Sequence, residues 1–106
     1  MNIAILGFGT IGSGVYEIVN QIQAEELKDC KVTKILDLPQ NKDKLDIIVC
    51  DINDITEDES IDLVVETMGG IHPAYEFIQN CLQHKKNVVT ANKAVVAAHM
   101  SDFLKS

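Results

Sequence analysis

Near its beginning the sequence reads Ile3-Ala4-Ile5-Leu6-Gly7-Phe8-Gly9-Thr10-Ile11-Gly12, a GxGxxG pattern that directly follows a short apolar run. Apolar residues at helical spacing come next, so the pattern lies between a predicted strand and a predicted helix. In that context Gly7 suits a tight turn, Gly9 lets the backbone approach a pyrophosphate, and Gly12 lets the helix pack closely on the sheet. The amides of the first helical turn would face the phosphates. Glycine spacings of this kind also arise by chance, but this context predicts a dinucleotide-binding loop.

The chain has 106 residues, of which 46% are hydrophobic and 24% are charged. This is enough for one domain with one core. No window approaches the ~18 apolar residues of a membrane span, and the first apolar run is too short for a signal peptide. We therefore expect a single cytoplasmic domain, residues 1–106, that does not contact a membrane.

Acidic residues outnumber basic ones by 16 to 9, which gives a net charge of −7. A nucleic acid would meet repulsion from such a chain, so we do not expect it as a partner. Cys30, Cys50 and Cys81 are odd in number and widely spaced, which fits neither a disulfide framework nor a zinc site. We expect no metal, and we interpret the cysteines as buried thiols in a reducing compartment.

Predicted strands at about 2–7, 31–37, 47–50, 61–67 and 87–90 alternate with helical segments, as in βαβ units. The last predicted helix covers about 94–104. Pro73 suits the first turn of an earlier helix, and Thr56 and Glu59 are spaced like a capping box that starts a short one. The first helix is expected to turn one apolar stripe toward the sheet, made of Ile11, Val15, Ile18, Val19 and Ile22.

Five parallel strands with right-handed crossovers predict an α/β fold, a Rossmann-like, doubly wound sheet in the order 3-2-1-4-5. Strand one then lies beside strand four at the topological switch point, and ligands of such sheets bind above the carboxyl ends of the strands. On that edge we expect residues 7–12, Asp37, residues 66–70 and residues 90–93.

Asp37 ends the second strand, where a carboxylate can accept hydrogen bonds from an adenosine ribose. This position favours NAD, because a carboxylate would repel the 2′-phosphate of NADP. Lys42 and Lys44 follow closely enough to offset that repulsion if the loop is flexible. The alternative is that Asp37 is only a solvated turn residue before Pro39. The sequence therefore favours NAD slightly over NADP.

Two further segments on the same edge carry polar groups and glycines. The fourth strand ends in Glu66-Thr67-Met68-Gly69-Gly70, where two glycines let the backbone pass close to the nicotinamide half of a cofactor. The alternative there is a loop that is merely flexible. Thr90 and Asn92 lead to Lys93 at a predicted helix start, where a lysine gains nothing from the helix dipole. Lys93 would bind a cofactor or substrate oxygen or assist proton movement, unless it is an ordinary surface lysine.

Residues 3–15, 62–70 and 87–94, taken together, resemble homoserine dehydrogenase. The resemblance spans nearly the whole chain but covers only the NAD(P)-binding domain of that family. It implies an oxidoreductase that reduces aspartate 4-semialdehyde to homoserine with NADH or NADPH, in the biosynthesis of threonine and methionine. This family implication is an analogy and not a derivation from the residues.

The resemblance also implies roles for individual residues. The loop with Gly7, Phe8, Gly9 and Gly12 would take the pyrophosphate, and Thr10 and Ile11 would supply helix-start amides. Thr67, Met68 and Gly69 would line the nicotinamide side together with Thr90, and Asn92 would lie beside them. Lys93 matches a lysine near the cofactor and the reaction centre, which makes it the candidate catalytic residue.

The sequence also departs from the family. Many relatives have an arginine just after strand two that suits NADP, whereas this chain reads Leu36-Asp37-Leu38-Pro39-Gln40. The substrate-binding acidic residues and the main catalytic lysine belong to a following domain that has no counterpart here. We therefore expect a truncated cofactor-binding domain that is inactive alone and meets a small-molecule substrate only with the missing domain.

Two further expectations concern self-association of the chain and an alternative function. The exposed edge of strand five would allow a homo-oligomer. A regulatory nucleotide-sensing module, in which the same fold binds a nucleotide without catalysis, is the alternative function. Such a sensor has little need for the hydrogen-bonding side chains of residues 90–93.

Overall fold

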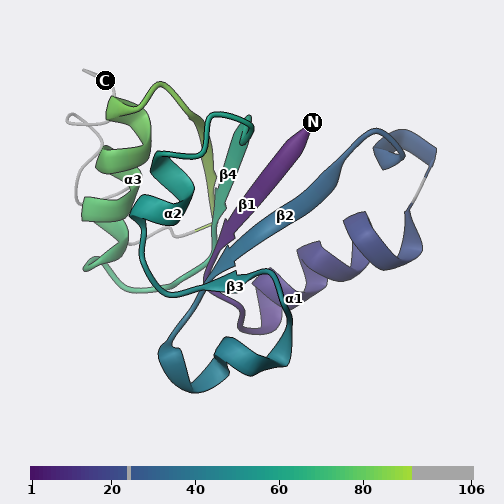
Figure 1. Ribbon diagram of the computed structural model, residues 1–106, viewed down its shortest axis with the longest axis horizontal. Helices are drawn as coiled ribbons and strands as arrows, with labels where there is room; N and C mark the ends of the chain where they lie inside the picture. The colour runs from purple at the N-terminus through teal and green to yellow at the C-terminus, as the bar shows by residue number, and fades with distance from the viewer. Residues whose placement is uncertain (24, 92–106) are drawn as a thin grey trace.

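The computed structural model describes residues 1–23 and 25–91 (Figure 1). Its five parallel strands form one sheet in the order β3-β2-β1-β4-β5. The strands are β1 (Asn2–Leu6), β2 (Lys31–Leu36), β3 (Ile48–Val49), β4 (Leu63–Glu66) and β5 (Asn87–Thr90). This confirms the predicted Rossmann-like α/β fold and its strand order. It also puts the carboxyl ends of β1 and β4 side by side, as the switch point requires.

Helices cover both faces of the sheet (Figure 1). On one face lies α1 (Thr10–Tyr16), which continues as a π-helical segment over Glu17–Ile22. On the other face lie α2 (Asn53–Thr56) and α3 (Ala74–Gln83). Short 3-10 helices at Glu25–Leu27 and Pro39–Lys44 lie before and after β2. The helix predicted over 94–104 lies outside the described residues.

The core consists of two apolar layers, one on each face of the sheet. In β1, Ile3 and Ile5 point toward α1, whereas Ala4 and Leu6 point toward α2 and α3. All four are buried. A parallel strand that is covered on both faces is apolar without interruption, which explains why the glycine loop follows an unbroken apolar run.

The predicted stripe of the first helix is wrong for three of its five residues. Val19 is buried and Val15 is half-buried, but Ile11, Ile18 and Ile22 are 56%, 46% and 61% exposed. For Ile18 and Ile22 the cause is a change of winding, because the segment 17–22 is π-helical and its hydrogen bonds span five residues, whereas Ile11 lies in the first turn of α1 at the glycine loop. A stripe spaced for an α-helix therefore does not stay on one side. Gly12 is the buried residue of α1.

Three other predictions need correction. Thr56 is the last residue of α2 and does not cap its start, because the Asp51 carboxylate accepts a hydrogen bond from the Asn53 amide at 2.9 Å and the helix begins there. Among the cysteines only Cys81 is buried, while Cys30 is half-buried and Cys50 is exposed. The third strand is only two residues long.

Among the described residues, every helix is too short or too polar to cross a membrane.

Candidate functional site

The three glycines of the GxGxxG loop meet three different steric demands. Gly7 has a φ of +95°, in the region that favours glycine, and a Cβ there would lie 3.2 Å from the Met68 Cα. A Cβ on Gly12 would collide with the Gly7 carbonyl oxygen and lie 2.9 Å from the Thr67 hydroxyl. A Cβ on Gly9 would meet nothing within 4 Å. Gly9 thus borders open space, as a backbone that receives a ligand should.

Helix α1 begins at the open side of this loop. Gly9 is its N-cap, and its carbonyl accepts hydrogen bonds from the Ser13 amide at 2.9 Å and the Ser13 hydroxyl at 2.7 Å. The amides of its first turn have no acceptor within the helix, as in any α-helix, and no side-chain cap hydrogen-bonds to them. Thr10 and Ile11 are exposed there, whereas the Phe8 ring packs edge-to-face on Tyr16 at 6.0 Å. Phe8 therefore offers its backbone, and not its ring, to the site.

An apolar cavity of about 190 Å³ lies beside the loop at the carboxyl ends of β1 and β2. We call it the Asp37 cavity. It is lined by Gly7, Leu36, Asp37, Leu38, Pro39, Cys50, Met68, Pro73 and Phe77. A small, mostly apolar hollow with one carboxylate suits an aromatic base and its ribose.

Asp37 is held in place at the edge of this cavity. Its amide donates to the Val49 carbonyl at 3.0 Å, which ties the end of β2 to β3. The Asn41 side-chain amide donates to the Asp37 carboxylate at 3.0 Å. Asn41 lies in the 3-10 helix that begins at Pro39. Asp37 is therefore a positioned, half-buried acceptor, unlike a freely solvated turn residue.

Thr67 joins the end of β4 to the glycine loop. Its amide donates to the Leu6 carbonyl at 2.9 Å, and its hydroxyl lies 3.1 Å from the same oxygen and 3.2 Å from the Gly7 carbonyl. A second cavity, of about 80 Å³, is lined by Ile11, Thr67, Gly69 and Ala91. Met68, which the sequence grouped with Thr67 and Gly69, lines the Asp37 cavity instead.

Glu66 links β4 to β5 beneath the same edge. Its side chain is fully buried, and its carboxylate accepts hydrogen bonds from the Met68 amide at 2.6 Å and from the Thr90 hydroxyl. Its carbonyl accepts from the Ala91 amide at 3.1 Å. In the sequence Glu66 is the residue with which the fourth strand ends, and the structure gives its carboxylate hydrogen-bond partners within the protein.

The structure therefore brings the glycine loop, Asp37, residues 66–69 and Thr90 to one edge of the sheet. Asn92 and Lys93, the remaining predicted site residues, lie outside the described residues. His72, another residue beside the double glycine, is exposed and lies 2.7 Å from the Glu76 carboxylate.

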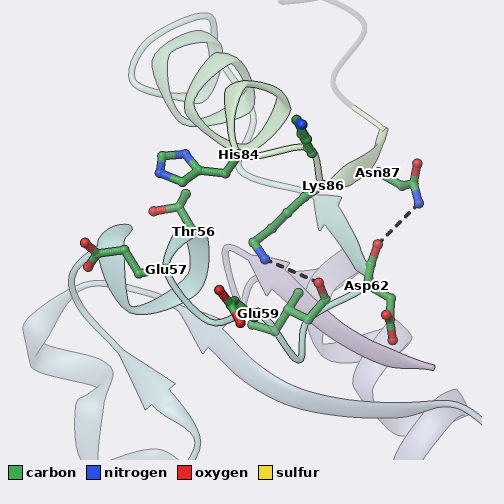
Figure 2. A pocket seen from close by; sticks show the side chains of 9 residues that line it. Thr56, Glu57, Glu59, Asp62, His84, Lys86 and Asn87 are labelled. Carbon is green, nitrogen blue, oxygen red and sulfur yellow. Dashed lines mark hydrogen bonds between the residues drawn. The ribbon is translucent and has the colours of Figure 1, made fainter.

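A larger pocket, of about 610 Å³, lies at the opposite edge, where β4 and β5 begin (Figure 2). Its buried Lys86 donates to the carbonyls of Asp58 at 2.7 Å and Ile61 at 3.3 Å. These bonds fix the connection between α2 and β4, so Lys86 has a structural role there. Size alone would favour this pocket as the site. We favour the smaller cavities, because ligands of open α/β sheets bind at the carboxyl ends of the strands.

The family model for the NAD-binding domain of homoserine dehydrogenase matches residues 7–105, nearly the whole chain. The chain belongs to the homoserine dehydrogenase family. Its site is accordingly that of a domain for a nicotinamide dinucleotide, and the comparisons with individual proteins agree with this assignment.

Homoserine dehydrogenase from Synechocystis sp. is 39% identical over 93% of this chain, and the enzyme from Bacillus subtilis is 32% identical over 98%. The matched parts are 24% and 26% of those proteins, so the chain spans about a quarter of their length. Among solved structures, a homoserine dehydrogenase from Thiobacillus denitrificans superposes with a TM-score of 0.86 at 28% identity, over 99% of this chain and 26% of that one. The Staphylococcus aureus enzyme superposes with a TM-score of 0.79 at 36% identity, over 99% of this chain and 30% of that one.

Sequence reasoning missed several residues of this homoserine dehydrogenase domain. They are Asn41, Cys50, Pro73 and Phe77, which come from three separate segments of the sequence and come together only in the fold. A polar residue four positions after Asp37 was the only local signal for Asn41. Cys50 was interpreted only as a buried thiol, and nothing near Cys50 or Phe77 in the sequence indicates a cavity.

Proposed function

We propose that residues 1–106 form the cofactor-binding domain of a homoserine dehydrogenase, and that the whole enzyme reduces aspartate 4-semialdehyde to homoserine. The observation that supports this most directly is the close packing of Gly12 on the Gly7 carbonyl, beside the open space in front of Gly9. The close packing of Gly12 allows the start of α1 to approach β1, and the open space in front of Gly9 leaves room for a diphosphate. The bound nicotinamide would supply or accept the hydride.

We propose a role for each group of residues at the carboxyl ends of the strands. The amides of residues 9–12 would hold the diphosphate, since they have no acceptor within the helix. Asp37 would accept hydrogen bonds from the adenosine ribose while the Asp37 cavity encloses the base. Thr67, Gly69 and Thr90 would border the nicotinamide, with Met68 between the two halves.

Lys93 keeps its proposed role on the strength of the family resemblance, and Asn92 would be a hydrogen-bonding group beside it. Lys93 would stabilise a cofactor or substrate oxygen near the reacting carbon, or assist the proton transfer to that oxygen. Lys93→Met in the intact enzyme should then lower kcat more than it weakens cofactor binding. An unchanged kcat would remove Lys93 from the mechanism.

The position of Asp37 supports NAD as the preferred cofactor. Calorimetric titration of the chain with NADH, NADPH and ATP tests this, with NADH expected to bind most tightly. Asp37→Ser removes the charge repulsion of the 2′-phosphate. The ratio of the NADPH dissociation constant to the NADH dissociation constant should therefore fall at least about tenfold. Asp43→Ser removes an exposed acid from the adjoining 3-10 helix and serves as the control. A preference for NADPH by the unaltered chain would refute the assignment.

The chain alone is expected to be inactive. Hydride transfer needs the substrate held against the nicotinamide, and a misplacement of ~1 Å costs about 10²-fold in rate. The homoserine oxidation rate of the chain should therefore be at background while cofactor binding persists. Appreciable turnover would contradict this expectation.

The alternative function is a nucleotide sensor without catalysis, and binding of ATP without NADH or NADPH in the same titration would favour it. We also propose the cytoplasm as the compartment. All three cysteines are free thiols, which suits reducing conditions.

A further inference from the structure

Asn41 holds the carboxylate that lines the Asp37 cavity. Asp37 is the only acidic residue among the described residues around this cavity, and Asn41 is not one of them. The Asn41 side-chain amide donates to the Asp37 Oδ2 at 3.0 Å. A carboxylate can accept about four hydrogen bonds on its two oxygens. The bond from Asn41 therefore fixes the carboxylate and leaves acceptor positions for a ligand.

The backbone around both residues brings their side chains together. The Asp37 amide donates to the Val49 carbonyl at 3.0 Å, which fixes the end of β2. Pro39 begins the 3-10 helix, and within it the Asn41 amide donates to the Leu38 carbonyl at 2.9 Å. This turn carries Asn41 back toward Asp37. Both partners of the side-chain hydrogen bond are thus anchored by backbone hydrogen bonds of their own.

A carboxylate held in one orientation has opposite effects on the two candidate cofactors. Without a partner, the side chain of Asp37 would populate several rotamers. Held by Asn41, it is a preorganised acceptor for the 2′-hydroxyl of an NADH ribose, so little order has to be gained on binding. The same carboxylate cannot turn away from the 2′-phosphate of NADPH, so their repulsion is retained.

We propose that Asn41 is a positioning residue that sets the cofactor preference through Asp37. Loss of its side-chain donor weakens NADH binding, because the acceptor must then be ordered when the ribose binds. The same loss relieves NADPH, because the carboxylate can rotate away from the phosphate. This inference rests on the proposed function, since it requires the adenosine ribose to lie at Asp37.

The test is the ratio of the NADPH dissociation constant to the NADH dissociation constant, measured by calorimetry. Asn41→Leu keeps the branched shape of the side chain but removes the donor, so the ratio should fall at least about threefold. Asp43→Ala truncates an exposed residue of the same 3-10 helix and should leave the ratio unchanged. A general loss of stability lowers both affinities alike, so the ratio separates positioning from folding.

The same substitution in an Asp37→Ser background shows whether Asn41 acts through Asp37. No carboxylate remains to be positioned there, so Asn41→Leu should change the ratio by less than about twofold. A larger fall would mean that Asn41 contacts the cofactor directly, which would overturn the inference. An undiminished ratio for Asn41→Leu in the otherwise unaltered chain would also overturn it. Both results leave the proposed function intact.

Two results for the unaltered chain reach further. If it binds NADH no better than NADPH, the inference fails together with the role of Asp37 in cofactor preference. If it binds neither cofactor, the proposed function fails as well.

Discussion

At the scale of single residues, the glycine loop shows how one motif combines separate constraints. Gly7 needs a backbone conformation with positive φ, Gly12 needs contact with the Gly7 carbonyl, and Gly9 borders open space. Fold and binding therefore depend on different members of the same motif. Substitution by alanine can separate the two.

Gly12→Ala should destabilise the domain, because its methyl group would overlap the Gly7 carbonyl and the Thr67 hydroxyl. Overpacking of this kind costs about 1–3 kcal/mol, which urea denaturation measures. Gly14→Ala is the matched control in the same helix, since a Cβ there meets nothing within 4 Å. That control should gain up to about 1 kcal/mol from helix propensity. Equal stability of the two variants would contradict the packing argument.

Gly9→Ala should leave the unfolding free energy nearly unchanged, because its Cβ meets no protein atom within 4 Å. The methyl group would instead occupy the space in front of the helix start. We expect NADH affinity to fall at least about tenfold. Titration of the folded variant measures this, and full affinity would place the diphosphate elsewhere.

At the scale of elements, the connection between α2 and β4 is held by charged groups from outside it. Lys34 of β2 lies 2.9 Å from the Asp58 carboxylate, and Lys86 donates to the carbonyls of Asp58 and Ile61. These contacts determine where β4 begins, and so help to place its other end at the cofactor edge.

Lys86→Met should destabilise the domain by about 1–3 kcal/mol, because the part-buried Asp58 carbonyl and the buried Ile61 carbonyl lose their charged donor. Lys85→Met is the control, since Lys85 is exposed. Thermal unfolding of both variants checks the expectation. A Lys86 variant as stable as its control would show that other groups satisfy these carbonyls.

The pH dependence of stability provides another test of this connection. Hydrogen bonds from Ser60 and the neighbouring Lys34 lower the pKa of Asp58 from 3.8 to about 2. Because this pKa is lower in the folded state, the stabilisation is fully present above about pH 4 and is lost as the pH falls toward 2. Ser60→Ala should therefore cost about 1 kcal/mol near neutral pH and progressively less in acid. A difference that does not vary with pH would contradict this.

The elements also show what local patterns could and could not predict. The strand order and the bounds of β5 follow from apolar runs and from the rules for crossovers, and both are confirmed. The apolar spacing does not indicate the π-helical winding after Tyr16, so the predicted apolar stripe of the first helix was wrong at Ile18 and Ile22. The position of Asp37 could be predicted from the end of its strand. The hydrogen-bond partners of Glu66 could not be predicted, because Thr90 is 24 residues away in the sequence and contacts Glu66 only through strand pairing.

At the scale of the whole molecule, the described residues include no strand on the outer side of β5. Val89 on this strand is 55% exposed. An exposed strand edge with an apolar side chain favours pairing with another chain. The proposed homo-oligomer would form there.

Val89→Lys should therefore weaken self-association of the chain, because a charge on an edge strand opposes pairing. Sedimentation over a range of concentrations measures the effect. Gln83→Lys adds the same charge at the exposed end of α3 and should leave association unchanged. A monomer at every concentration would remove the basis for an oligomer through β5.

The place of β1 in the middle of the sheet affects how the chain folds during synthesis. β1 is made before both of its neighbours, and the second neighbour, β4, follows about sixty residues later. Until then one flank of this apolar strand lacks its partner, and a nascent polypeptide in that state is prone to aggregate. The unit of β1, α1 and β2 can assemble early, whereas the crevice above the switch point exists only after β4 has left the ribosome. The cofactor site is thus completed only once β4 has been made, although the glycine loop is synthesised well before that strand.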